Sequence, residues 1–176
     1  LYAILRYDPV ADFSPISLIA RVPLLLVAHP SFPANDFKGF LELAKKRPGA
    51  LNYGSPGAGT PHHLAMELLK RARGAEVPHV PYKGAAPAVQ DLIGGQIPLM
   101  VLDTAVALPQ LRGGKIKALG VLAAARLTTL PDVPTIIEQG VADVARALQF
   151  FFTSTPYARV DRIYLIGGAC VVPGLC

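Results

Sequence analysis

The stretch YGSPGAGTPHHLAMEL, residues 53–68, decides the fold, because it joins an apolar strand to a helix through a glycine-rich loop. Residues 51–54, LNYG, predict the short strand. Thr60 and Pro61 favour a helix start, since threonine accepts a hydrogen bond from a free amide and proline has no N–H to leave unpaired. Apolar residues then fall on one helical face: Leu64, Leu68, Leu69 and Ala72. The stretch therefore predicts a strand, a loop and a helix in succession.

The same alternation continues along the chain. A helix is predicted from Asp36 to Pro48, and further helices over 85–95 and 104–114. Further strands are predicted over 76–80, 97–102 and 116–123. Residues 14–30 read as extended, because they are apolar and interrupted by prolines. This order predicts an α/β fold with a mainly parallel sheet covered by helices on both faces.

Composition narrows the class of protein. Of 176 residues, 52% are hydrophobic and 16% are charged, which is typical of a chain that forms a globular core. The net charge of +5 is scattered, and its densest runs lie late in predicted helices, where cations complement the helix dipole. We therefore predict no nucleic-acid partner. No stretch approaches the roughly 18 uncharged apolar residues of a membrane span, so direct membrane insertion is not expected.

The two ends of the chain carry few signals. The sequence begins at Leu1 without an initiator methionine, so we expect it to be part of a longer protein. The final stretch, from about Arg146, has no clear period. Its two cysteines, Cys170 and Cys176, allow one optional disulfide and make a poor metal site without further ligands nearby.

A parallel sheet gathers its strand-to-helix loops at one edge. We therefore expect residues 54–60, 81–85 and 103–105 to converge on one crevice. The loops offer backbone amides, one cation at Lys83 and one carboxylate at Asp103. They also offer the hydroxyl groups of Ser55, Thr60, Tyr82 and Thr104. This set predicts a site for a small, polar, anionic ligand.

Three enzyme motifs are near misses in the glycine loop. Gly54 and Gly59 have the spacing of a phosphate-binding loop, but Thr60 and Pro61 stand where the lysine and the hydroxyl residue belong. A dinucleotide fingerprint fails because His62 replaces its third glycine, and Ser55 has the wrong spacing for a nucleophile elbow. No catalytic residue and no cofactor are predicted. Ligand contact and a plain capped turn both remain open for this loop.

Several other polar residues can be explained by ordinary structural roles. The adjacent His62 and His63 lack the i, i+4 spacing of a metal-binding pair. His79 and His29 have no acidic or cysteine partner at a suitable spacing, so no metal site is predicted. Asp103 is either a helix cap or a ligand contact, and Lys83 either a solvated cation or a ligand clamp. Two acidic residues are interpreted as surface charges rather than catalytic acids: Glu67 and Glu138.

Three segments together resemble a known family. LNYGSPGAGTPHHLAMELLK, HVPYKGAAPAVQDLIGGQIPLM and GGKIKALGVLAAARLTTLPDVPTIIEQG are similar to the Bug-type, TctC-like extracytoplasmic solute receptors, and YDPVADFSPISLIARVPLLLVAHPSFPA resembles the segment before them. The resemblance runs from about Leu1 to Gly140. These receptors are the substrate-binding components of tripartite tricarboxylate transporters.

The resemblance implies a periplasmic binding protein with two α/β domains that close over a small carboxylate ligand and deliver it to a membrane permease. It implies no enzymatic activity. By position, the family's carboxylate-binding loop corresponds to Ser55, Gly57, Ala58, Gly59 and Thr60. Support is expected from His63 and Asp103, with Tyr82 and Lys83 bordering the cleft.

Two departures from the family pattern shape the domain prediction. The family's first-domain opening is missing, and its C-terminal strand and helices are not recognisable after residue 150. We therefore expect residues 1–33 to be a remnant of the first domain with a hinge strand, and 34–122 to be a complete ligand-binding domain. Residues 123–145 are expected to return to the first domain, and 146–176 to form a divergent tail. The alternatives are a truncated, non-functional receptor or an α/β enzyme that uses Asp103 as a base.

Overall fold

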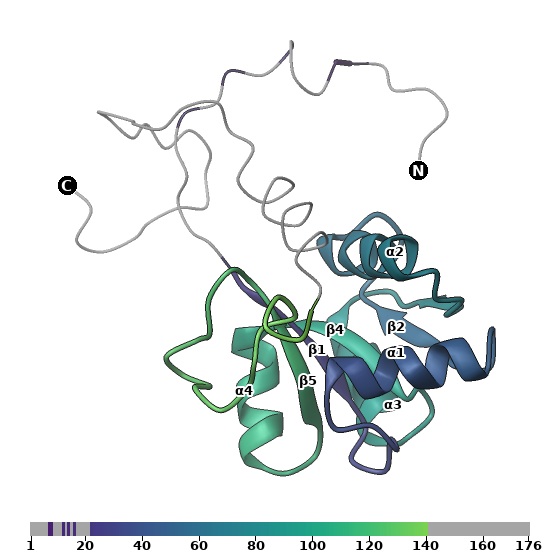
Figure 1. Cartoon of the computed structure of the whole chain (residues 1–176). Helices are drawn as coiled ribbons and strands as arrows, with labels where there is room; N and C mark the ends of the chain where they lie inside the picture. The colour runs from purple at the N-terminus through teal and green to yellow at the C-terminus, as the bar shows by residue number, and fades with distance from the viewer. Residues whose placement is uncertain (1–6, 9–11, 13, 15, 17–21, 141–176) are drawn as a thin grey trace. The chain divides into compact units, whose positions relative to one another are not determined.

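The computed structural model describes residues 7, 8, 12, 14, 16 and 22–140 (Figure 1). Residues 22–140 belong to one compact unit, and the described residues before them belong to a second. In the second unit, the Asp12 amide donates to the Asp8 carbonyl at 3.1 Å. The two cysteines and the predicted divergent tail lie outside the described residues. No helix in the described part is long and apolar enough to cross a membrane.

The larger unit is built on one mixed five-stranded sheet in the order β3-β2-β4-β1-β5 (Figure 1). Its strands are β1 (Leu24–Ala28), β2 (Tyr53–Ser55), β3 (His79–Pro81), β4 (Leu99–Asp103) and β5 (Lys117–Leu122). β2 pairs in parallel with β3 and β4, whereas β1 runs antiparallel to both β4 and β5. Four strands therefore share one direction, which confirms the prediction of an α/β fold with a mainly parallel sheet.

Helices cover both faces of this sheet, as predicted. They are α1 (Phe37–Lys46), α2 (Pro61–Arg73), α3 (Ala85–Ile93) and α4 (Thr104–Arg112). One core cluster joins α1 and α2 to alternate residues of the strands, including Leu26 and Val101. A second cluster joins α3 and α4 to the intervening residues, including Leu25 and Leu102. Because side chains alternate along a strand, the two clusters lie on opposite faces.

The position of β1 was not predicted. The sequence analysis placed residues 14–30 before the ligand-binding domain, yet β1 lies between β4 and β5, and all five of its residues are buried. The all-apolar sequence LLLVA fits this position, because a central strand covered on both faces has no solvent side. A domain boundary at residue 33 therefore does not separate β1 from the sheet.

Residues 123–140 also pack against this unit. Val121 forms a parallel bridge with Thr135, and Ile136 is fully buried in the first core cluster. The Gln139 side chain accepts from the Phe37 amide at 2.6 Å and donates to the Leu119 carbonyl at 3.1 Å. The division into a first and a second domain stays a prediction, with these contacts as its structural context.

Candidate functional site

Two of the three loops predicted to converge are joined directly. The Tyr82 amide donates to the Ser55 carbonyl at 3.0 Å, and the Gly84 amide donates to the Pro56 carbonyl at 2.9 Å. These bonds continue the parallel pairing of β2 and β3 beyond the strands. The loops after β2 and β3 therefore lie side by side at the carboxyl edge of the sheet.

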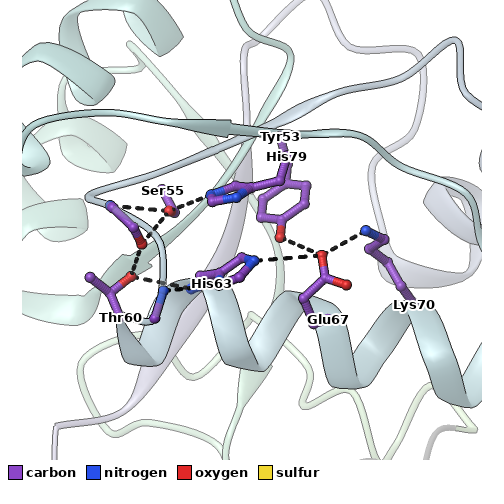
Figure 2. Close-up of polar contacts among 9 residues, drawn as sticks. Tyr53, Ser55, Thr60, His63, Glu67, Lys70 and His79 are labelled. Atoms are coloured by element: carbon purple, nitrogen blue, oxygen red, sulfur yellow. Dashed lines mark hydrogen bonds and ion pairs between the residues drawn. The ribbon is translucent and has the colours of Figure 1, made fainter. Parts of the chain in front are cut away.

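The glycine loop, residues 54–60, is closed by hydrogen bonds within itself (Figure 2). Ser55 Oγ accepts from the Gly57 amide at 3.2 Å, and Thr60 Oγ1 donates to the Gly57 carbonyl at 2.8 Å. Thr60 is also the N-cap of α2, since its Oγ1 accepts from the His63 amide at 3.4 Å. The loop and the start of the helix are thus one hydrogen-bonded unit.

At two positions of this loop a side chain would meet an obstacle, for different reasons. Gly59 has φ +82°, a left-handed conformation that side chains disfavour. A Cβ at Gly54 would stand 2.4 Å from Ile97 Cδ1, so the end of that side chain would have to move. The loop therefore combines a special backbone conformation with close packing beneath it.

The start of α2 presents unpaired backbone donors. In the described part of the chain, the amides of Ala58 and His62 donate to no acceptor, and Pro61 has no amide hydrogen. Ala58 is exposed. Free amides at a helix start, together with the positive end of the helix dipole, favour an anion.

Asp103 lies close to α2. It is the last residue of β4, and its Oδ2 stands 3.2 Å from His62 Nε2. The contact is poorly aligned, because both ring nitrogens of the nearly buried His62 lack a well-formed hydrogen bond. Asp103 occupies the N-cap position of α4 without making a side-chain cap bond. A plain capping role therefore does not account for this carboxylate.

The remaining predicted polar groups are less available. The Tyr82 hydroxyl donates to Asp91 Oδ2 at 2.7 Å, and burial together with this bond raises the pKa of Tyr82 to about 12. Thr104 Oγ1 donates to the Pro23 carbonyl at 2.7 Å and so anchors the start of β1. Lys83 is exposed. Of these three side chains, Lys83 is the one that remains open to a ligand.

A polar cluster behind the glycine loop was missed by the sequence analysis (Figure 2). Tyr53 stacks on His79 with ring centroids 4.9 Å apart, and His79 stacks on His63 at 4.1 Å. His63 Nδ1 accepts from the Gly59 amide at 3.1 Å, and His79 Nε2 lies 2.6 Å from Ser55 Oγ. The stack therefore contacts the loop near both of its ends.

Glu67 corrects one interpretation of the sequence. The sequence alone predicts a surface charge here, but Glu67 Oε1 accepts from the Tyr53 hydroxyl at 2.8 Å and from Lys70 Nζ at 2.6 Å. Burial alone would raise the pKa of Glu67, but the bonds from Lys70 and Tyr53 lower it below its ordinary value. Glu138 is exposed, as expected, and pairs with Arg126 at 3.0 Å.

Spacing on α2 was the available signal for this cluster. His63, Glu67 and Lys70 stand four and three residues apart, which places them on one helix face. The pairing of Tyr53 with His79 across two strands has no comparable signal in the sequence. That part of the cluster appears only when β2 and β3 are aligned.

The geometry gives little support to catalysis or metal binding. Ser55 and His79 form a serine–histidine contact that the sequence analysis did not anticipate, but Ser55 is fully buried and its hydroxyl is occupied by Gly57. A nucleophile must reach its substrate, so this pair is better explained as support for the loop. Among the described residues, no group of three His, Cys, Asp or Glu side chains could hold a metal ion.

Comparison with known proteins gives consistent matches. The model of the tripartite tricarboxylate transporter family receptor matches residues 1–161. Rpa4515 of R. palustris, solved with adipate, is 33% identical at a TM-score of 0.73, and the match covers 88% of this chain and 57% of that one. MatC from Rhodopseudomonas palustris, with bound malate, is 36% identical at a TM-score of 0.72, and the match covers 78% of this chain and 47% of MatC.

The periplasmic binding protein BugD is similar to the same extent. It is 38% identical at a TM-score of 0.71, and the match covers 78% of this chain and 46% of BugD. The chain spans a little under half the length of the curated relatives it matches first.

Proposed function

This chain belongs to the tripartite tricarboxylate transporter receptor family, and we propose that it captures a small dicarboxylate outside the cytoplasm. Two similar proteins were solved with adipate and with malate, and each of these compounds carries two carboxylates. BugD, which is similarly related, is a periplasmic binding protein. These likenesses support a carboxylate ligand and a periplasmic location.

One observation carries the proposal. The amides of Ala58 and His62 have no acceptor among the described residues at the start of α2, and the sequence resemblance assigns carboxylate binding to the loop before it. A carboxylate fits these donors because it is acceptor-only and carries the charge that the helix dipole favours. The lysine that reaches the outer phosphates in a phosphate-binding loop is absent, which favours a carboxylate over a polyphosphate.

The predicted residues then divide by role. Ala58 and Gly59 bring the backbone to the ligand, and Thr60 fixes the helix start. Ser55 and Gly57 close the loop from beneath. These roles rest on the internal bonds of the loop and stay predictions for the ligand itself.

Residues outside the loop complete the proposed site. Lys83, exposed on the adjacent loop, supplies a cation at the border, and the Tyr82 ring borders the site with its hydroxyl turned to Asp91. Asp103 orients a hydrogen-bond donor of the ligand, because its Oδ2 has no well-aligned bond within the described residues. His63 supports the loop from behind.

The proposed mechanism is binding and delivery. No bond of the ligand is made or broken. The ligand is captured by domain closure, of the kind that binding proteins use, and is passed to the membrane permease of the transporter.

Calorimetric titration of the full chain with adipate and with malate tests the proposal. We expect saturable binding. Thr60→Ala should weaken it about fivefold, because loss of the cap, typically about 1 kcal/mol, loosens the loop that holds the free amides in place. A monocarboxylate of equal length should bind more weakly than the dicarboxylate.

Asp36→Ala is the matched control. Asp36 caps α1 by accepting from the Gly39 amide at 2.7 Å, far in sequence from the glycine loop. Its removal should cost a similar amount of stability and leave the dissociation constant unchanged. Equal weakening by both variants, or saturable binding that is indifferent to Thr60, would argue against the loop as the carboxylate seat.

A further inference from the structure

The contact between His63 and Gly59 fixes the state of the imidazole ring. The Gly59 amide donates to His63 Nδ1 at 3.1 Å, so Nδ1 must carry a lone pair and not a hydrogen. The ring is then neutral with its hydrogen on Nε2. That nitrogen faces Glu67 Oε1 at 3.9 Å, which is consistent with a donor (Figure 2).

We propose that His63 is a positioning residue whose neutral, Nε2-protonated form holds the glycine loop in its ligand-binding shape, and that protonation of the ring releases the loop. The inference rests on the proposed function in one respect, that the loop receives the carboxylate. A protonated ring would turn an N–H toward the Gly59 N–H, so two donors would face each other and the bond would be lost.

The charges around His63 act on a second ring proton in opposite directions. Glu67 on α2, at 3.9 Å, attracts it, but this carboxylate is already shared with Lys70 Nζ at 2.6 Å and with the Tyr53 hydroxyl of β2. His79 of β3 lies face to face with His63, so two imidazolium rings would repel each other. Burial and the neighbouring His63 also hold the pKa of His79 below its ordinary value.

His79 makes the opposite end of the loop less sensitive to protons. Its Nε2 lies 2.6 Å from Ser55 Oγ, and a hydroxyl can either donate to that nitrogen or accept from it. If Nε2 carries hydrogen, Ser55 can still donate to the Gly57 carbonyl at 3.0 Å. The contact therefore survives either state of His79, and the sensitivity to protonation belongs to His63.

The first test needs no ligand. Nitrogen-15 NMR of the full chain at about pH 8 should show the Nε2–H tautomer for His63, and the Gly59 amide should be protected from hydrogen exchange. Protection should be lower at about pH 5 than at about pH 8, because a ring with hydrogen on both nitrogens cannot accept from the Gly59 amide. His63→Ala should remove protection throughout, whereas His63→Asn should restore it, because the asparagine oxygen can stand close to Nδ1.

The second test links the loop to binding. Adipate affinity is measured by calorimetry at about pH 8 and about pH 5.5 for the native chain and for His63→Asn. Ionisation of adipate affects both proteins equally, so the difference between them isolates the ring. We expect the native chain to lose about fivefold to tenfold more affinity than His63→Asn, the size of one lost hydrogen bond. His79→Gln serves as the matched control and should keep the native pH dependence.

The outcomes separate the two ideas. An Nδ1–H tautomer, or a Gly59 exchange rate unchanged in His63→Ala, would overturn the positioning role. Affinity that rises on acidification in the native chain but not in His63→Asn would also overturn it, since the ring would then act as a cationic ligand contact. If the NMR signatures are present and adipate and malate fail to bind at pH 8, the positioning role is supported and the proposed function fails.

Discussion

Tyr53→Phe is the most informative single change in the polar cluster, because it deletes one oxygen atom from a fully buried side chain. That hydroxyl donates to Glu67 Oε1 at 2.8 Å. A hydrogen bond to a charged group contributes about 1.5–3 kcal/mol. Glu67 keeps its bond to Lys70 and its side chain is 35% exposed, so it is not orphaned and the lower figure applies. We expect a loss of about 1.5 kcal/mol at pH 7.

The same hydroxyl makes stability depend on alkaline pH. Burial, and then the bond to Glu67, raise the pKa of Tyr53 well above its ordinary value of about 10. The folded chain therefore keeps this proton where the unfolded chain loses it. The contribution is complete below pH 10 and declines as pH rises, by about 1.4 kcal/mol per pH unit. The native and Tyr53→Phe stability curves should converge and cross near about pH 11.

Urea unfolding followed by circular dichroism measures both effects, as a shift of the midpoint at constant slope. Tyr82→Phe is the matched control, since its hydroxyl also donates to a carboxylate, Asp91, but its side chain is only half-buried. It should cost less at pH 7. If Tyr53→Phe leaves the midpoint unchanged at pH 7, or parallels the native curve up to pH 11, the Tyr53–Glu67 bond does not stabilise the fold.

Two further predictions concern stability. Glu67→Gln should make stability depend less on pH in the acid range. The lowered pKa of Glu67 adds stability above the ordinary glutamate pKa of about 4.3, and that stability is lost as pH falls. The native and variant stability curves should therefore meet in an acid titration followed by circular dichroism. Gly74→Ala should lower the free energy of unfolding in urea by about 1 kcal/mol. Gly74 caps α2 at φ +62° with open space around it, so the cost comes from the backbone conformation alone. An unchanged unfolding midpoint would contradict this.

The secondary structure was predictable because each signal is local. The sequence TPHH, residues 60–63, predicts the start of α2, and Gly74 ends the helix in a left-handed conformation. The place of β1 was not predictable in this way. An apolar run such as LLLVA indicates burial on both faces, but strand order is set by pairing between distant segments, here residues 24–28 with 99–103 and 117–122. Periodicity carries no information about which strands become neighbours.

The candidate site could be predicted only where its signals are local in the sequence. Thr60 and its loop follow from cap and glycine rules, and the structure joins them as one hydrogen-bonded unit. Tyr82 and Thr104 were expected to offer hydroxyls, but Asp91 and the Pro23 carbonyl take them. Those acceptors lie on other elements, so a count of polar residues in a loop overstates what is free for a ligand.

The polar cluster shows why the proposed site, which is made of backbone amides, needs side chains that would touch no ligand. An amide selects a carboxylate only if its direction is fixed, and a glycine-rich loop has little rigidity of its own. Here Ser55 and His63 hold the loop from below, and His79 and Glu67 hold them in turn. These supports come from three elements, so the shape of the loop depends on the correct packing of β2, β3 and α2. The shape of the proposed carboxylate site is therefore a property of the fold and is not set by the glycine motif alone.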